Sequence, residues 1–251
     1  MRKTKARLYV DDDLTEGARL VLSGAAAHYL ATVMRAEPGD AVALFNGRDG
    51  EWLAQVAEAG RKRVELDVGA RTRAQAAEPD LWLCFAPLKK TATDFVVEKA
   101  CELGVARILP VLTRRTVAAR VNVERLRATA REAAEQCERL TLPEVAEPLS
   151  LERLIADWST ERSLLYMDES GGGAPISEVL GASSADGVHA LLTGPEGGFE
   201  PAELDALRIL SSAVAVGLGP RILRAETAAV AALACWQALR GDWRDGPRGT
   251  T

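Results

Sequence analysis

The sequence predicts an α/β protein in which a small β-rich domain precedes a larger domain built on a parallel sheet. The first segment contains short strands and one helix, which favours a small β-barrel-like domain over residues 1–74. The second segment alternates buried strands with amphipathic helices, which favours a parallel sheet with helices on both faces over residues 75–245. A length of 251 residues suits one small and one medium domain. Residues 246–251 are expected to form a flexible tail.

In the first domain, alternation and turn residues mark the strands. ARLYV (6–10) and RVELDVG (63–69) alternate apolar and polar side chains, which is typical of half-buried strands. AVALFNGRDGEWLAQVAEA (41–59) places an NG–DG turn between two apolar runs and predicts a hairpin. SGAAAHYLATVMR (23–35) predicts a helix. The polar stretch TRAQAAEPD (72–80) is the expected boundary between the domains.

In the second domain, strands and helices alternate along the chain. The predicted strands are residues 80–88, 106–112, 163–167, 188–194 and 212–218. The predicted helices are residues 91–104, 122–140, 150–158, 174–181, 201–210 and 224–240. Asn122 is placed to cap the long amphipathic helix that follows it. Open parallel sheets bind ligands at the carboxyl ends of their strands, so the turns that follow the strands are the places to look for a site.

Composition excludes several classes of protein. Apolar residues make up 47% and charged residues 27%, as in an ordinary soluble globular protein. The most apolar stretch, residues 225–240, carries Glu226, Gln237 and Arg240 and is too short and polar to span a bilayer. The basic start of the chain meets three aspartates before any apolar run, so no secretory signal is expected. Four separated cysteines and two histidines give no zinc pattern, so we expect no metal and a cytoplasmic protein with free thiols.

Arginine is concentrated in one part of the chain. The net charge of −5 argues against a protein that coats nucleic acid indiscriminately. Residues 107–131 nevertheless contain seven arginines against one acid, Glu124. Guanidinium groups bind phosphate and stack on bases, but a solvated helix face shows the same pattern. Charge alone therefore leaves RNA contact and a solvated surface equally open.

Two glycine-containing turns carry the strongest functional signal. LLTGPEGGFEP (191–201) runs from a buried strand through three glycines into a helix, and VGLGPRILRAET (216–227) runs through two glycines into the last helix. Glycines at the end of a strand let the main chain approach a ligand closely. A tight turn that needs a positive φ angle would be satisfied by one glycine, so the additional glycines favour a ligand site.

Neither turn fits the familiar phosphate-binding motifs. A P-loop has a GK[ST] sequence after its glycines, and the dinucleotide fingerprint needs a third glycine that GLGPRILR lacks. The sequence therefore predicts a cofactor other than ATP or NAD, held by main-chain groups rather than by charged side chains.

At these two turns the sequence resembles the RsmE family, the 16S ribosomal RNA uracil-N3 methyltransferases of the SPOUT superfamily. The matching stretches in the second domain are LLTGPEGGFEPAEL, GLGPRILRAETA, EKACELGV, RRTV and REAAEQCERLTLPEV. In the first domain RLYV, HYLATVMRAEPGD and LFNGRDGEW also look like the family. The sequence departs from the family at Thr116, where serine is expected.

The resemblance implies a PUA-like RNA-binding domain followed by a SPOUT-type α/β domain with a trefoil knot. It also implies a homodimer that uses S-adenosylmethionine to methylate N3 of a uridine in 16S ribosomal RNA of the small ribosomal subunit. Main-chain groups at eight positions would hold the adenosine part of the cofactor: Leu192, Gly194, Gly197, Gly198, Leu218, Gly219, Ile222 and Leu223. Five further residues would line the pocket: Met167, Thr193, Glu196, Arg224 and Thr227.

Methylation of N3 requires that the N3 proton leaves, which puts negative charge on O2 and O4 of the uracil. Neither glycine turn contains a histidine. We therefore expect donors that stabilise this anion, with Arg224 as the catalytic candidate beside main-chain N–H groups of the turns. His189 begins a buried strand and is expected to be structural.

The candidates for RNA contact are basic residues in both domains. They are Lys5, Arg7 and Arg35 in the first domain, and Lys89, Lys90, Arg114, Arg115 and Arg120 in the second. Each one alone is equally well explained as a solvated charge, but the set predicts salt-sensitive RNA binding.

The sequence disfavours two other functions. The intact glycine turns argue against a catalytically inactive PUA-like RNA-binding module, and the missing fingerprint argues against a dinucleotide-dependent oxidoreductase.

Overall fold

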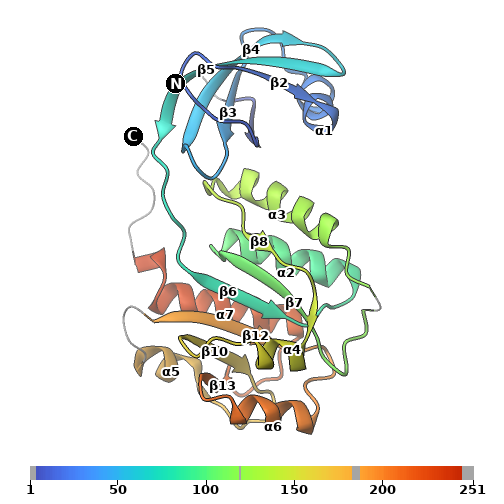
Figure 1. The fold of residues 1–251 in the computed structure, drawn as a ribbon, viewed down its shortest axis with the longest axis vertical. Coiled ribbons are helices and arrows are strands. Elements are labelled where there is room, and N and C mark those ends of the chain that lie inside the picture. The colour runs from blue at the N-terminus through green and yellow to red at the C-terminus, as the bar shows by residue number, and fades with distance from the viewer. Residues whose placement is uncertain (1–3, 119, 183–186, 245–251) are drawn as a thin grey trace. The chain divides into compact units, whose positions relative to one another are not determined.

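The computed structural model describes residues 4–118, 120–182 and 187–244, and the chain divides into two compact units (Figure 1). Unit 1 comprises Met1–Ala77 and Arg131–Leu142, and unit 2 comprises Glu78–Ala130 and Pro143–Thr251. The division falls close to the boundary expected after residue 74, but it assigns the end of a long helix to unit 1. The domain bounds derived from the sequence stay a prediction. The expected tail at 246–251 lies outside the described residues.

Unit 1 is built on a curved five-stranded sheet (Figure 1). Its strands are β1 (Ala6–Tyr9), β2 (Arg19–Ser23), β3 (Ala41–Phe45), β4 (Glu51–Ala59) and β5 (Arg63–Arg73). They lie in the order β1-β3-β4-β5-β2, with β1 parallel to β3 and the other pairs antiparallel. Helix α1 (Gly24–His28) continues as a π-helical turn over Tyr29–Val33. The predicted small β-domain with one helical segment is confirmed, although strand β2 was not predicted.

The turn between β3 and β4 follows from its sequence. Asn46 Oδ1 accepts hydrogen bonds from the main-chain N–H groups of Arg48 at 3.0 Å and Asp49 at 2.9 Å. Gly50 has a φ of 87°, and a Cβ atom there would overlap the main-chain oxygen of Arg73. The hairpin that the NG–DG pattern predicted is therefore confirmed.

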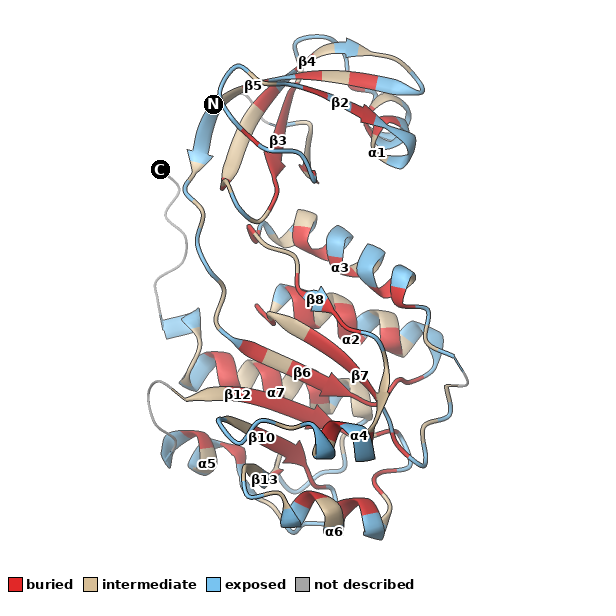
Figure 2. Ribbon diagram, in the orientation of Figure 1, coloured by how far each residue is buried: buried red, intermediate tan, exposed pale blue. Residues whose placement is uncertain are grey.

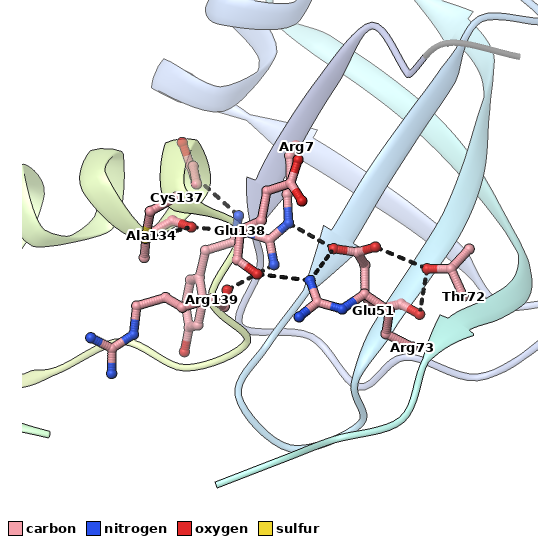
Figure 3. A network of polar contacts seen from close by, with 10 residues as sticks. Arg7, Glu51, Thr72, Arg73, Ala134, Cys137, Glu138 and Arg139 are labelled. Carbon is pink, nitrogen blue, oxygen red and sulfur yellow. Dashed lines mark hydrogen bonds and ion pairs between the residues drawn. The ribbon is translucent and has the colours of Figure 1, made fainter. Parts of the chain in front are cut away.

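Within unit 1, Arg7 joins β1 to the end of helix α3 (Val123–Cys137; Figure 3). Its Nη1 donates to the carbonyl oxygen of Ala134 at 2.9 Å, and its Nη2 donates to that of Arg139 at 2.7 Å. Its Nε pairs with Glu51 Oε2 at 2.7 Å, and the two side chains are only 9% and 13% exposed. One of these carbonyls lies in the last turn of α3 and the other just beyond its end, where carbonyl groups lack the regular partners of a helix interior.

Two neighbours complete the network around Glu51 (Figure 3). Arg73 Nη1 donates to the carbonyl oxygen of Glu138 at 2.7 Å and lies 3.4 Å from Glu51 Oε2. Burial opposes the charge of Glu51, but the hydrogen bonds from Arg7 and Thr72 outweigh it and hold the pKa of Glu51 below its ordinary value. These bonds occupy the Arg7 guanidinium within unit 1, so we leave Arg7 out of the RNA-binding candidates.

Unit 2 contains an eight-stranded sheet in which every strand pairing among the described residues is parallel. Its strands are β6 (Leu81–Phe85), β7 (Arg107–Leu112), β8 (Glu144–Val145), β9 (Leu149–Ser150), β10 (Arg162–Met167), β11 (Ala174–Pro175), β12 (Val188–Thr193) and β13 (Ala213–Gly217). The order is β11-β13-β10-β12-β6-β7-β8, with β9 beside β7. The predicted parallel sheet is confirmed.

Helices cover both faces of this sheet. They are the first part of α3 together with α2 (Lys90–Glu102), α4 (Leu151–Ala156), α5 (Ile176–Ala182), α6 (Pro201–Ile209) and α7 (Ala225–Leu239), followed by a 3₁₀ turn at Asp242–Arg244. Leu83 and Leu191 pack with α2, α5 and α7 in one apolar cluster, and Cys84 and Leu192 pack with α4 and α6 in another. The central strands are buried along most of their length (Figure 2). This is the expected signature of strands covered on two sides.

Smaller expectations are also met in unit 2. Asn122 Oδ1 accepts from the N–H of Arg125 at 3.1 Å and caps α3 as predicted. His189 is 1% exposed and lies edge-on to the Trp236 ring, and burial lowers its pKa, as expected of a structural histidine. Burial raises the pKa of Cys84 to about 12, so its thiol is unreactive. The described part of the chain contains no helix that is long and apolar enough to cross a membrane.

The Arg7 network leads to a test of stability. We expect Arg7→Ala to lower the free energy of unfolding by about 3 kcal/mol, because it removes the mostly buried ion pair with Glu51 and one donor each from the carbonyl oxygens of Ala134 and Arg139. Urea unfolding followed by circular dichroism measures the change. The matched control is Arg19→Ala, which removes an exposed ion pair with Asp67 and should cost less than about 1 kcal/mol. Equal losses in the two variants would show that the network contributes no more than a surface pair.

Candidate functional site

Three neighbouring parallel strands end at one edge of the unit 2 sheet. Strand β10 lies between β12 and β13, and all three run in the same direction. At the end of β10, Met167 is in register with Val216 of β13. The turn after β12 (194–200) and the turn after β13 (218–224) therefore leave the sheet on either side of β10. Both glycine turns thus lie at one edge of the sheet, called here the shared edge, where the carboxyl ends of the strands were expected to carry a site.

Close packing of neighbouring side chains explains why the turn after β12 requires glycines. A Cβ atom on Gly194 would lie 3.0 Å from the ring of Phe199, which is buried beneath the turn. Gly198 has a φ of 68°, and a Cβ atom there would overlap Oε1 of Glu169. The Glu169 carboxylate, which follows β10, therefore rests directly on the glycine turn. Glu169 was not among the predicted cofactor-binding residues.

A buried carboxylate holds the same turn from the other side. Glu203, in the first turn of α6, is only 5% exposed. Its Oε2 accepts from the N–H of Glu200 at 2.8 Å, and its Oε1 accepts from the N–H of Arg114 at 2.9 Å. Two charge-assisted bonds thus tie the end of the glycine turn to the segment that follows β7. The spacing of Glu200 and Glu203 in EPAE is a helix-start signal that could have pointed to this residue.

Arg115 makes a second connection between these two segments. Its Nη1 donates to the carbonyl oxygen of Gly197 at 2.8 Å, and its Nε lies 3.9 Å from Glu200 Oε1. Its aliphatic stem is close enough that a Cβ atom on Gly197 would lie 3.4 Å from Cδ of Arg115. Arg115 was predicted to contact RNA, whereas these contacts make it a brace for the glycine turn.

The segment after β10 forms a third wall at the shared edge. Asp168 is buried, and its Oδ1 accepts from the main-chain N of Ser170 at 2.9 Å and from its hydroxyl at 2.6 Å. Oδ2 lies 4.0 Å from the Arg208 guanidinium. A Cβ atom on Gly173 would lie 2.5 Å from the main chain of Val216, so this tight turn packs directly against β13. Asp168 therefore fixes the turn that carries Glu169.

The turn after β13 is more exposed. Gly219 has a φ of 95°, and Ile222 is 92% exposed. Arg224 is an exposed residue immediately before α7, and no ion pair of the described residues includes it. Thr227 lies exposed in the first turn of α7. These two side chains are therefore free to contact a ligand at this edge.

The other predicted cofactor residues fall into two kinds. Leu192 is fully buried and Thr193 is 3% exposed, so each offers the edge main-chain groups rather than a side chain. Met167 is 7% exposed at the strand end, whereas Glu196 and Gly197 lie exposed at the tip of the turn. The sheet brings the whole predicted set to one edge; which of these residues touch a cofactor stays a prediction.

The remaining candidates for RNA contact differ in how they are engaged. Lys5 pairs with Asp40 at 3.3 Å, and the Arg114 side chain is 61% exposed with Glu152 at 3.7 Å. Four more are exposed and take part in no ion pair among the described residues: Arg35, Lys89, Lys90 and Arg120. Within residues 4–118, 120–182 and 187–244, no three His, Cys, Asp or Glu side chains are grouped as metal ligands.

Comparisons with known proteins agree on one family. A family model for the RNA methyltransferase domain matches residues 76–237, and one for the RNA methyltransferase PUA domain matches residues 22–69. The protein from Rickettsia conorii named ribosomal RNA small subunit methyltransferase E is 32% identical over 229 residues, covering 91% of this chain and 93% of that protein. The protein of the same name from Mycobacterium tuberculosis is 32% identical over 245 residues, covering 94% and 92%.

Solved structures with a cofactor are similar over nearly the whole chain. The ribosomal RNA small subunit methyltransferase E from Neisseria gonorrhoeae, bound to S-adenosylmethionine, has a TM-score of 0.85 and 27% identity, covering 95% of this chain and 99% of that one. A methyltransferase from Legionella pneumophila in complex with the same cofactor has a TM-score of 0.85 and 28% identity, covering 94% and 98%.

The glycine turn after β12 gives a test of the site. We expect Gly198→Ala to weaken S-adenosylmethionine binding by about tenfold, because alanine must adopt the strained φ of this position and its methyl group displaces Glu169. Isothermal titration calorimetry measures the affinity, and thermal unfolding reports the accompanying loss of stability. The control is Gly181→Ala, where the added Cβ has open space. Wild-type affinity in Gly198→Ala would place the cofactor away from this turn.

Proposed function

The chain belongs to the RNA methyltransferase family, and we propose that it uses S-adenosylmethionine to methylate N3 of a uridine in 16S ribosomal RNA. The activity as an S-adenosylmethionine-dependent ribosomal RNA methyltransferase rests on relatives of that name that align over more than 90% of this chain. The observation that carries the proposal to this chain is the shared edge, where turns 168–173, 194–200 and 218–224 meet around the ends of β10, β12 and β13.

The residues at this edge fit the proposed cofactor. S-adenosylmethionine, when bound, supplies a methyl group on a positively charged sulfur. It carries no phosphate, so its site needs main-chain donors and acceptors rather than lysines or a metal ion. Gly194 and Gly198 leave no room for side chains in the turn after β12, which keeps the main chain accessible. The exposed carboxylates of Glu169 and Glu196 suit a cationic ligand.

We assign the cofactor residues as the resemblance implies. Main-chain groups hold the adenosine at Leu192, Gly194, Gly197, Gly198, Leu218, Gly219, Ile222 and Leu223. Met167, Thr193, Glu196, Arg224 and Thr227 line the same pocket. The buried braces, Glu203 and Asp168, do not touch the ligand in this assignment; they hold the turns that do. Positioning of this kind is a major part of catalysis when the methyl group is already activated.

Arg224 is assigned to the negative charge that develops on the uracil. A uracil that loses its N3 proton carries that charge on O2 and O4. The Arg224 side chain is exposed immediately before α7, where the positive end of the helix dipole adds to its charge. Both groups stabilise an anion, and a guanidinium offers several N–H donors to two oxygens.

The RNA surface that we propose excludes Arg7 and Arg115, whose guanidinium groups bind main-chain carbonyls. It retains Lys5, Arg35, Lys89, Lys90, Arg114 and Arg120, with the PUA domain as a second RNA-binding element. The whole small subunit or its 16S RNA is the expected partner. Because these contacts are with phosphates, binding should weaken steeply as salt increases.

Three further properties follow from the resemblance and are proposals for this chain. We propose a homodimer, which the exposed apolar side chains of Ile209 (85%) and Ile222 (92%) support. We propose a cytoplasmic location, which the four free cysteines support. We propose a trefoil knot in the segment that carries the two glycine turns. Leu233 and Trp236 of α7 pack in the core of unit 2, so the proposed dimer interface does not use them.

Calorimetry and methylation assays test the proposed function. We expect the protein to bind S-adenosylmethionine and not NAD, and to transfer labelled methyl groups to 16S RNA or to assembled small subunits from cells that lack the protein. Mass mapping of the product identifies the modified base. Binding of RNA without any affinity for S-adenosylmethionine would instead identify an RNA-binding module without catalysis, and binding of NAD would identify an oxidoreductase.

Arg224 is tested separately. We expect Arg224→Ala to lower the methylation rate about 100-fold while it leaves the affinity for S-adenosylmethionine nearly unchanged, because the loss of one donor to a developing anion costs about this much. Arg221→Ala, an exposed arginine in the same turn, is the matched control. A wild-type rate in Arg224→Ala would remove the residue from the catalytic assignment.

A further inference from the structure

A cavity of about 480 Å³ opens in unit 2 beside the start of α2 and the start of α3. Four apolar residues form part of its lining: Pro87, Leu88, Val117 and Val121. The volume lies in the range of pockets that bind small molecules, about 300–1,000 Å³, and is large enough for one nucleotide. None of the residues assigned to the cofactor lines this cavity.

Two segments that line the cavity are hydrogen-bonded, just before they reach it, to the end of β12 and to the glycine turn that follows β12. The N–H of Ala86 donates to the carbonyl oxygen of Thr193 at 2.9 Å, and the chain then continues as the cavity lining at Pro87. Arg115 donates to the carbonyl oxygen of Gly197, and the chain enters the lining two residues later at Val117. The cavity therefore adjoins the shared edge and is fixed to it by main-chain contacts.

The rim of the cavity carries positive charge without matching carboxylates. Lys89, Lys90 and Arg120 line it, are exposed, and take part in no ion pair among the described residues. Arg125 also lines it and lies 3.4 Å from Asp94. Most other arginines of unit 2 have a carboxylate partner, for example Arg162 with Asp80 at 2.6 Å. The rim thus gathers three of the few cations of unit 2 that have no carboxylate partner among the described residues.

The position of Lys89 and Lys90 at the start of a helix makes their positive charges electrostatically unfavourable in the free protein. Lys89 is the N-cap of α2, Lys90 is its first residue, and no acid lies in the first turn of this 13-residue helix. Cations at the amino end of a helix are disfavoured by the helix dipole, whereas anions are favoured there. Helix α3 also begins at the cavity, and the acid in its first turn, Glu124, is paired with Arg127. Two helix starts and three cations thus present positive potential to the same opening.

We propose that this cavity binds one unpaired nucleotide of the substrate RNA, with its base on the apolar lining and its phosphate on Lys89, Lys90 and Arg120. The inference rests on the proposed function, because that function supplies RNA as the ligand. A phosphate is the anion that cationic side chains and helix starts bind together. Proteins that recognise RNA by sequence bind bases that have left the stack, and enzymes that act on a base extrude nucleotides into pockets. The cavity therefore receives a nucleotide next to the site of methyl transfer.

Binding of a single nucleotide tests the proposal directly. The probes are uridine 5′-monophosphate and uridine, titrated into the full chain and followed by ligand-observed NMR at low salt. We expect the monophosphate to bind about tenfold more tightly than uridine, because only the monophosphate meets the cationic rim. The double variant Lys89→Ala/Lys90→Ala should lose this preference. The matched control is Arg153→Ala, which removes an exposed cation elsewhere in unit 2 and should keep it.

A second variant tests the cavity without changing charge. Val117→Trp fills the lining from a side chain that is 70% exposed and lies outside the core clusters, and we expect it to abolish nucleotide binding while it leaves the thermal unfolding midpoint and S-adenosylmethionine affinity close to wild type. Equal binding of uridine and its monophosphate, or wild-type nucleotide binding in both the lysine variant and Val117→Trp, would overturn the proposal.

The outcome is separable from the proposed function. If the chain binds S-adenosylmethionine and methylates ribosomal RNA but nucleotide binding ignores the cavity variants, the nucleotide site is wrong and the enzyme assignment stands. If the monophosphate binds in the cavity but no methyl transfer occurs, the nucleotide site stands and the enzyme assignment fails. Where both hold, the lysine variant should raise KM for the RNA more than it lowers kcat, since it removes contacts to a phosphate rather than to the reacting base.

Discussion

The parallel pairing of β10 with both β12 and β13 is the constraint on which the functional site depends. In a parallel sheet all carboxyl ends lie at one edge, so turns that are far apart in the sequence become neighbours without any contact between their side chains. The register is held by the apolar residues that alternate between the two clusters, because a slip of one residue would exchange the two faces. Such a slip would also break the hydrogen bond from the N–H of Asp168 to the carbonyl oxygen of Val216 in β13. The geometry of the site is thus a consequence of how the core is packed.

Turns that are rich in glycine are flexible, and two buried carboxylates, Glu203 and Asp168, hold the turns beside them in one conformation. Glu203 binds the N–H groups of Glu200 and Arg114, and Asp168 binds the main chain and hydroxyl of Ser170. A buried carboxylate is costly unless such donors surround it, so each acid holds its turn in the one conformation that supplies them. Arg115 adds a bond to the carbonyl of Gly197 and so restrains the tip as well. A rigid main-chain site can then bind a ligand with little loss of conformational entropy.

Local patterns in the sequence predicted what is local in the structure. The alternation of strands and helices, the NG–DG hairpin and the Asn122 cap all follow from residues near one another in the chain. The shared edge of the glycine turns follows instead from the rule that parallel strands end at the same edge of a sheet. The roles of Arg7 and Arg115 could not be predicted, because their partners lie 127 and 82 residues away. Composition identifies a cationic side chain but cannot say whether its donors face solvent, phosphate or a carbonyl group. Strand β2 was missed since RLVLS offers only five residues directly before a helix.

Cationic side chains that already bind a protein group have a structural role, whereas those without such a partner are available to a ligand. Arg7 and Arg115 bind main-chain oxygens, so their charge is already used to hold the fold. Lys89, Lys90 and Arg224 instead lie at the starts of α2 and α7, where a cation costs about 0.3–1 kcal/mol relative to a neutral residue. Glu226 in the first turn of α7 offsets part of that cost, whereas α2 has no such acid. A helix start that concentrates positive charge is unfavourable in the free protein and favourable once negative charge arrives. The same electrostatic argument therefore underlies both proposals, a phosphate at α2 and the developing uracil anion at α7, in which RNA binding would relieve the repulsion that the fold maintains.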